Sequence, residues 1–160
     1  MTVRENLMLA PDGQLGERAW APLFASPRVL AQEKAIAARA EETLAFLELT
    51  RVADAYAGQL SGGQRKLLEL ARALMREPRL VLLDEPMAGV NPTLARKLMD
   101  KIETLRRERG ITFLLVEHDL ETVFTRCDPI VVMAHGHVLA QGDAAAIRAN
   151  AEVVNAYLGG

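Results

Sequence analysis

A serine and two glycines stand directly before a predicted helix, in the segment Leu60-Ser61-Gly62-Gly63-Gln64. Consecutive glycines let the backbone approach a ligand closely, and the first turn of a helix offers unpaired N–H groups at its positive end. The Ser61 hydroxyl is a further donor. This arrangement suits a phosphate group, although a Ser-Gly-Gly alone is more often an ordinary turn with a serine cap.

Two carboxylates follow a short apolar run at residues 80–83, which has the pattern of a strand buried on both faces. Asp84 and Glu85 therefore stand at the carboxyl end of a strand, where ligands of open α/β sheets bind. One carboxylate can hold a magnesium ion, and the other can orient or deprotonate a water molecule. Pro86 is expected to keep Glu85 extended. A plain solvated turn explains Asp-Glu-Pro equally well.

A histidine, His118, follows the apolar run 111–116, which predicts a second buried strand. A neutral imidazole at the same edge of the sheet as the two carboxylates could hydrogen-bond a phosphate oxygen. A lone histidine there is more often an ordinary turn residue. His135 and His137 fall in a predicted hairpin turn, and we expect both to be exposed.

The first part of the chain is predicted to be helical, and the later part is predicted to alternate between helices and strands. Residues before about Gly58 show only helical periodicity, carried by a set of apolar residues: Val29, Leu30, Ile36, Ala40, Leu44 and Leu47. Between this helix and a short opening one lies a loop that contains Trp20 and Phe24, which we expect to pack onto the helices. From Gly58 onward helices and strands alternate, which implies an α/β sheet preceded by a helical subdomain.

Helix and turn signals mark several boundaries in the second part. Asn91 and Pro92 have the N-cap and N1 pattern of a helix that ends before Gly110. Residues 130–140 predict a β-hairpin, and Asp143 can cap a final pair of short helices.

Composition limits the classes of protein that fit. Of the 160 residues half are apolar and a quarter charged, with a net charge of −2, so the balance gives no sign of nucleic acid or anionic lipid as a partner. The single cysteine, Cys127, cannot form an internal disulfide, which favours a reducing, cytoplasmic setting. No apolar run approaches the roughly 20 residues that span a bilayer, and the opening residues are unlike a signal peptide. We therefore expect a soluble chain that could still dock onto a membrane protein.

Taken together, the motifs resemble the nucleotide-binding subunits of ABC transporters. The signature is 60–64, Walker B is 80–85, the D-loop is 88–92 and the switch histidine is His118. Each motif alone is weak, whereas all four in this order are strong. Finer features at 2–6, 66–75, 89–92 and 154–159 are similar to the branched-chain amino-acid uptake branch. Gly62, where that branch often has an aromatic residue, and Asn91, where many D-loops have Asp, depart from the pattern.

The resemblance implies ATP and Mg²⁺ as cofactors and a role for each motif. Asp84 would assist the metal, Glu85 would polarise the attacking water and His118 would contact the γ-phosphate. Four residues would bind ATP across the interface with a second ATPase subunit: Ser61, Gly62, Gly63 and Gln64. Membrane-spanning permease subunits would be the other partners, so the expected location is the cytoplasmic face of the cell membrane, with no nucleic acid involved.

The resemblance also implies a fold class, an incomplete P-loop NTPase core of the ABC ATPase type with a preceding helical subdomain. Its parts would be a helical subdomain at 1–58, the signature-to-switch part of the core at 59–142 and C-terminal helices at 143–160. A P-loop ends in a Gly-Lys pair, which this sequence lacks. The chain therefore looks like a C-terminal portion of a subunit, from truncation, a mis-assigned start or a split gene. Alone it is expected to bind ATP very weakly and to associate.

Two alternatives stay open at this point. Chromosome-organising and DNA-repair ATPases share the signature and Walker B, but they need long coiled-coil heptads that are absent here. A non-catalytic remnant or a partner-dependent half-site module is the other alternative, and the missing P-loop favours it.

Overall fold

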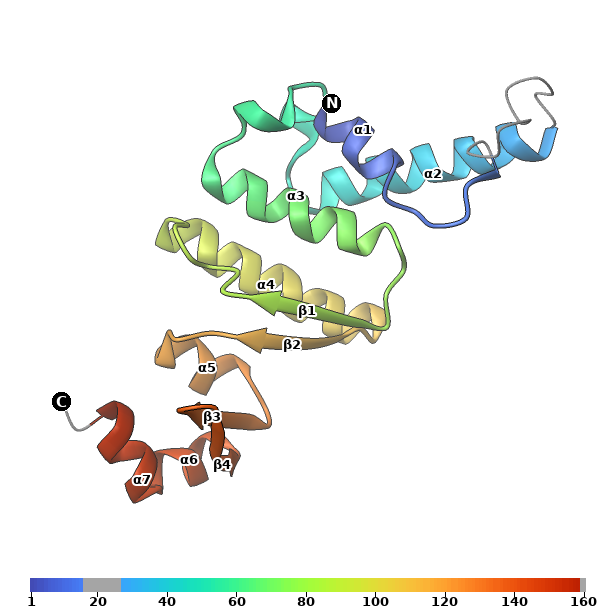
Figure 1. Cartoon of the computed structure of the whole chain (residues 1–160). Helices are drawn as coiled ribbons and strands as arrows, with labels where there is room; N and C mark the ends of the chain where they lie inside the picture. The colour runs from blue at the N-terminus through green and yellow to red at the C-terminus, as the bar shows by residue number, and fades with distance from the viewer. Residues whose placement is uncertain (16–26, 159–160) are drawn as a thin grey trace. The chain divides into compact units, whose positions relative to one another are not determined.

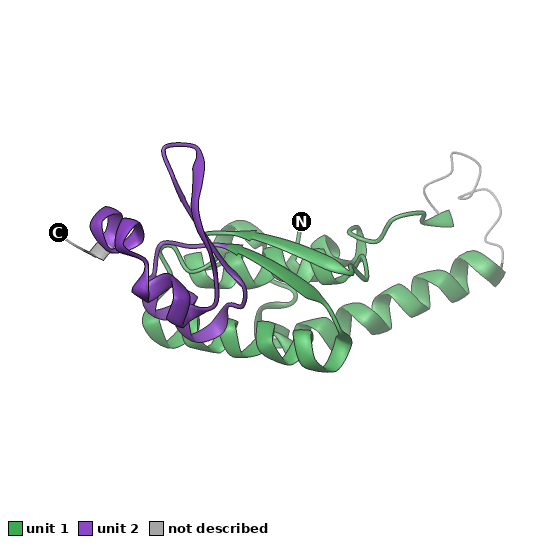
Figure 2. Cartoon of the chain, turned by 90° about the horizontal axis from the view of Figure 1, so that it is seen from below, with its two compact units in different colours: residues 1–115 green, residues 116–160 purple. Residues whose placement is uncertain are grey.

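The computed structural model describes residues 1–15 and 27–158, so Trp20 and Phe24 lie outside the described residues. The chain divides into two compact units, Met1–Leu115 and Val116–Gly160, which are coloured separately in Figure 2. The division falls at neither of the boundaries expected near residues 58 and 142, because the helical part and the first strands share one core. We describe each unit by itself.

Unit 1 opens with three helices, α1 (Val3–Met8), α2 (Pro27–Phe46) and α3 (Gly62–Leu74), with short 3₁₀ turns at Thr50–Val52 and Ala57–Gln59 (Figure 1). The Thr2 side chain caps α1, and Glu5 reaches back to the Thr2 amide at 2.8 Å, a capping box. Arg4 pairs with Glu41 of α2 and with Asp54 of the following turns. These contacts attach the short first helix to the rest of the unit.

A β–α–β unit completes unit 1. Strand β1 (Leu80–Asp84), helix α4 (Pro92–Arg109) and strand β2 (Thr112–Val116, whose last residue begins unit 2) follow in sequence, and the arrows of the two paired strands point the same way in Figure 1. The Asn91 side chain accepts a hydrogen bond from the Leu94 amide at 2.9 Å, and Gly110 ends α4 with a φ of 65°. The predicted N-cap, N1 proline and terminal glycine of this helix are therefore confirmed.

The core of unit 1 collects one face of each helix. Ile36, Ala40, Leu44 and Leu47 are buried as the helical spacing predicts, whereas Leu30 is 55% exposed, contrary to the prediction. Leu30 lies in the first turn of α2 and is not among the described residues that form the core of unit 1. One face of α3 is buried along its length: Leu67, Leu70, Ala71 and Leu74.

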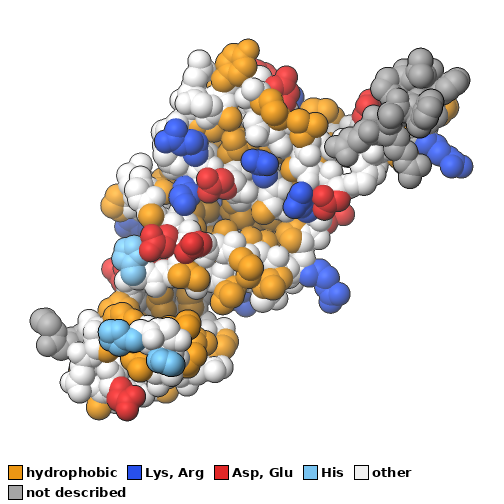
Figure 3. Space-filling model, in the orientation of Figure 1, with side chains coloured by type: hydrophobic (Ala, Val, Ile, Leu, Met, Phe, Trp, Pro, Cys, Tyr) orange, Lys and Arg blue, Asp and Glu red, His pale blue; other side chains and the backbone are white. Residues whose placement is uncertain are grey.

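The prediction that β1 and β2 are buried on both faces is wrong for this chain. Their exposure alternates, and four apolar side chains are more than half exposed: Leu80, Leu82, Leu114 and Val116. Figure 3 shows apolar side chains at the surface in this region. One face of the two-stranded sheet packs on the core of unit 1, and among the described residues of that unit no further helix or strand covers the other face, so only alternate residues enter the core.

We expect Leu82→Lys to reduce self-association of the chain, because Leu82 is 67% exposed on the uncovered strand face. The change should leave the free energy of unfolding within about 0.5 kcal/mol of the original value. Light scattering and binding of an apolar dye would measure the effect. Val81→Lys is the matched control on the opposite face, where the side chain is 5% exposed, and it should unfold the chain instead. Unchanged self-association in the Leu82 variant would show that this face is not responsible.

Unit 2 contains the predicted hairpin and the short helices. Helix α5 (Leu120–Arg126) precedes β3 (Ile130–Ala134) and β4 (His137–Gly142), and α6 (Ala144–Ala149), α7 (Ala151–Val153) and a π-helical turn (Val154–Leu158) follow. The strands pair antiparallel, with Ala134 opposite His137. His135 and Gly136 both have positive φ, 50° and 79°, as a tight two-residue hairpin turn requires. His135 and His137 are exposed, as predicted, and a small cluster of its own, centred on Ile130, Ile147 and Val153, holds this unit together.

Candidate functional site

The signature segment forms the N-terminus of α3. Ser61 is the N-cap: its hydroxyl oxygen accepts a hydrogen bond from the Gln64 amide at 3.3 Å, and the Gln64 side-chain oxygen accepts one from the Ser61 amide at 2.9 Å. The amides of Gly62 and Gly63 belong to the first turn, which has no acceptors within the helix. The sequence therefore folds into the arrangement predicted for a phosphate, a serine hydroxyl beside N–H groups at the positive end of a helix of 13 residues.

The second signature glycine is required by packing. A Cβ on Gly63 would lie 2.2 Å from Leu94 Cδ2, with Leu94 Cγ at 3.4 Å and Val90 Cγ1 at 3.5 Å. A Cβ on Gly62 would meet only the Gly89 carbonyl oxygen, at an ordinary 3.7 Å. The signature turn therefore rests directly on the loop that follows the two carboxylates.

We expect Gly63→Ala to destabilise the chain by about 1–3 kcal/mol, because the added methyl group must displace Leu94. Gly62→Ala is the matched control and should change the free energy of unfolding by less than about 0.5 kcal/mol. Urea unfolding followed by circular dichroism would measure both. Equal effects of the two substitutions would contradict the packing argument.

Asp84 and Glu85 lie at the carboxyl end of β1, both exposed, as the strand prediction requires. The expectation that Pro86 keeps Glu85 extended is wrong, since Glu85 has a φ of 43°. The chain reverses here through two successive turns, in which the Ala88 amide donates to the Glu85 carbonyl and the Val90 amide to the Met87 carbonyl, both at 3.1 Å. The left-handed conformation of Glu85 lets the chain turn directly after β1. For a residue with a side chain this conformation costs about 1–2 kcal/mol of free energy. The left-handed backbone therefore sets the direction in which Cβ of Glu85 leaves the main chain.

His118 belongs to unit 2, where it follows β2 and is exposed. Its neighbour Asp119 stands at the N-cap of α5, but the Asp119 carboxylate accepts from the Thr122 hydroxyl at 2.6 Å instead of capping the backbone. Burial raises the pKa of the Cys127 thiol, and the nearby Glu117 carboxylate raises it further, so this thiol stays protonated near neutral pH. In unit 1 the structure brings the signature together with the loop after Glu85, whereas His118 belongs to unit 2.

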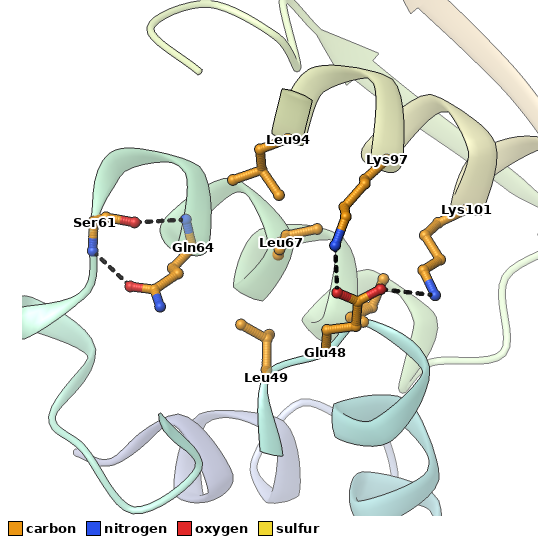
Figure 4. A pocket seen from close by; sticks show the side chains of 9 residues that line it. Glu48, Leu49, Ser61, Gln64, Leu67, Leu94, Lys97 and Lys101 are labelled. Atoms are coloured by element: carbon orange, nitrogen blue, oxygen red, sulfur yellow. Dashed lines mark hydrogen bonds and ion pairs between the residues drawn. The ribbon is translucent and has the colours of Figure 1, made fainter. Parts of the chain in front are cut away.

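A pocket of about 270 Å³ lies beside the signature helix (Figure 4). Ser61 and Gln64 line one side, and the opposite side carries Glu48, which is held between two lysines of α4. Lys97 Nζ donates to Glu48 Oε2 at 2.9 Å, and Lys101 Nζ lies 3.6 Å from Glu48 Oε1. The hydrogen bond from Lys97 is the largest cause that lowers the pKa of Glu48, and the charges of both lysines lower it further.

Glu48, Lys97 and Lys101 belong to none of the sequence motifs. The spacing of Lys97 and Lys101 is a detectable signal, since residues four apart share one face of a helix. Nothing local marks Glu48 as their partner, because the contact spans 49 residues.

The described residues suit a magnesium ion that is bound jointly by the protein and by a phosphate ligand. Among the described residues, no three His, Cys, Asp or Glu side chains gather as a ligand cluster. Asp84 is a single exposed carboxylate at the end of a strand, which suits an ion that keeps its waters and is held chiefly by nucleotide phosphates.

The β–α–β unit with two carboxylates after its first strand, joined to a helix that begins at Ser-Gly-Gly, is the architecture of an ATP-binding cassette within the P-loop NTPase fold. The family profile for ABC transporters matches residues 1–88, and one for branched-chain amino acid ATP-binding cassette transporters matches 137–160. The chain belongs to the ABC transporter family of ATP-binding proteins.

Individual relatives agree with this assignment. A probable branched-chain amino acid transport ATP-binding protein LivG of Archaeoglobus fulgidus is 45% identical over 99% of the chain and 60% of its own length. The high-affinity branched-chain amino acid transport ATP-binding protein BraF of Pseudomonas aeruginosa is 41% identical over 99% of the chain and 62% of its own length. A solved ATP-binding cassette of an ABC transporter, in its ADP conformation, superposes with a TM-score of 0.77 at 37% identity, covering 100% of the chain and 63% of that structure.

The chain thus spans about 60% of the length of the curated relatives that it matches. In the part of the chain that the structure describes, no helix is long and apolar enough to cross a membrane.

Proposed function

We propose that this chain acts as the signature-bearing part of an ATP-hydrolysing subunit of an ABC importer for branched-chain amino acids. The observation that carries the proposal is the Ser61–Gln64 capping box, which presents a hydroxyl and free first-turn amides beside the loop that follows Asp84 and Glu85. The relatives' names supply the substrate class, since both the Archaeoglobus and the Pseudomonas proteins are described as branched-chain amino acid transport ATP-binding proteins.

In the proposed mechanism two ATPase subunits pair head to tail, and the signature of one meets the ATP held by the P-loop of the other. Ser61 and the two glycine amides would donate hydrogen bonds to the phosphates across that interface, where positioned donors are most effective. In such a pair the partner subunit would supply the P-loop for the ATP that this signature completes.

In a subunit that also has a P-loop, the remaining residues would act on the nucleotide bound there. Asp84 would hold Mg²⁺, which neutralises phosphate charge; Glu85 would polarise the attacking water; and His118 would donate to the γ-phosphate. The helical part, residues 1–58, would contact membrane-spanning permease subunits on the cytoplasmic face of the membrane.

The test uses a partner that cannot act alone. A full-length ABC ATPase that forms homodimers, with its signature serine replaced by arginine, should hydrolyse ATP very slowly, since both sites of its dimer lack a working signature. Adding this chain should restore turnover in proportion to the amount added, because each mixed dimer gains one complete site. No gain in turnover at any ratio of the two proteins would overturn the proposal and favour a non-catalytic remnant.

A further inference from the structure

The turn after α2 has an unusual residue at its tightest point. The Leu49 amide donates to the Leu44 carbonyl at 2.8 Å and the Glu48 amide to the Ala45 carbonyl at 3.2 Å, which is the hydrogen-bond pattern of a Schellman helix end. Glu48 occupies the left-handed position of that motif, with a φ of 59°. Glycine is the usual residue there because it has no Cβ to strain. A glutamate at this position therefore needs a compensating interaction.

That interaction is the double ion pair with α4. Each carboxylate oxygen of Glu48 faces its own lysine, Lys97 at 2.9 Å and Lys101 at 3.6 Å. The same face of α4 reaches Phe46, over whose ring Lys101 Nζ lies 4.9 Å from the centroid. The end of α2 is thus tied to α4 through charge, and two residues of one turn take part.

The signature helix α3 contacts α4 directly. Gly63 packs on Leu94, one turn before Lys97, and Ser61 and Gln64 line the pocket whose other wall carries Glu48 and the two lysines (Figure 4). The ionic contact across this pocket joins α4 to the end of α2, and α2, α3 and α4 share the core of unit 1, so it restrains the pocket wall that lies opposite the signature.

We propose that Glu48, Lys97 and Lys101 form an ionic latch that positions the Ser61–Gln64 signature relative to α4, and that Glu48 stands at a glycine position for this purpose. The role of the latch in ATP hydrolysis rests on the proposed function, whereas its existence does not. Glu48 acts through the signature and is a positioning residue.

Three variants separate the latch from the helix end. Glu48→Gln removes the charge at nearly constant size, a Lys97→Gln, Lys101→Gln double variant removes its partners, and Glu48→Gly removes the latch while it relieves the backbone. Hydrogen exchange of the full 160-residue chain would be measured at the amides of residues 47–53 and 62–66. Glu33→Gln, on the exposed side of α2, is the matched control and should leave exchange unchanged.

Loss of the latch should speed exchange in both segments by about two- to tenfold at low salt, the range expected for one or two exposed ion pairs. The effect should nearly vanish at about 1 M salt, where the screening length is near 3 Å. Combining the Glu48 and lysine changes should add nothing further. Glu48→Gly should loosen both segments while the melting temperature stays level or rises, which a purely stabilising role would not produce.

Two results would overturn the latch: additive effects of the Glu48 and lysine changes, or wild-type exchange in Glu48→Gly. In the mixed ATPase assay, latch variants should lower turnover two- to tenfold in low salt, about the same factor as for exchange. If the mixture shows no ATPase at all, the proposed function fails, and the exchange measurement still decides the latch by itself.

Discussion

The Ser61→Arg variant of this chain is expected to lose at least about 100-fold of the ATPase turnover that the chain restores to a signature-disabled partner. An arginine at the N-cap fills the space where a phosphate would meet the hydroxyl, and it removes the donor itself. The measurement is turnover of the mixture at saturating ATP, at equal amounts of original and variant chain.

Two further variants separate binding from folding. Ser61→Asp keeps a good N-cap for α3 but places a negative charge against the phosphates, so it should be as inactive as the arginine variant while the helix stays intact. Ala31→Arg adds the same positive charge on the exposed side of α2 and should leave turnover within about twofold, as surface changes usually do. Full activity of the Ser61→Asp variant would show that Ser61 acts only as a helix cap.

The Leu44→Ala variant is expected to lower the free energy of unfolding by about 2–5 kcal/mol. Leu44 is fully buried in the core of unit 1, and its carbonyl accepts the hydrogen bond that closes the turn after α2. Truncation would leave a cavity where α2 meets the rest of the core. Chemical unfolding followed by circular dichroism measures the change.

Leu30→Ala on the same helix is the control for helix propensity and composition. Leu30 is 55% exposed, so its truncation should shift the free energy of unfolding by less than about 0.5 kcal/mol. If the two variants were equally stable, the described core of unit 1 would be wrong at α2.

Much of the candidate site follows from the sequence because its signals are local. Ser61 and Asn91 specify helix starts through side-chain bonds to amides three residues ahead, and Gly110 specifies a helix end through a left-handed φ. The hairpin turn at His135 and Gly136 is equally local. The order of the motifs then led to the family, because four weak local signals in one sequence are jointly specific.

Other properties depend on residues far apart in the chain, and only the tertiary structure decided them. Apolar runs predicted strands but not which face of β1 is covered, since that depends on what packs there. Gly63 is required because Leu94, 31 residues away, packs against it. At Glu85 the chain reversal after β1 overrides the preference for extended backbone that a residue before proline has. In the sequence Glu48 is an ordinary polar residue. Only the fold brings two lysines of α4 to its carboxylate, and these ion pairs compensate for its left-handed backbone. Local capping and turn energies are encoded within a few residues, whereas coverage, close approach and ion pairing arise only when distant segments pack together.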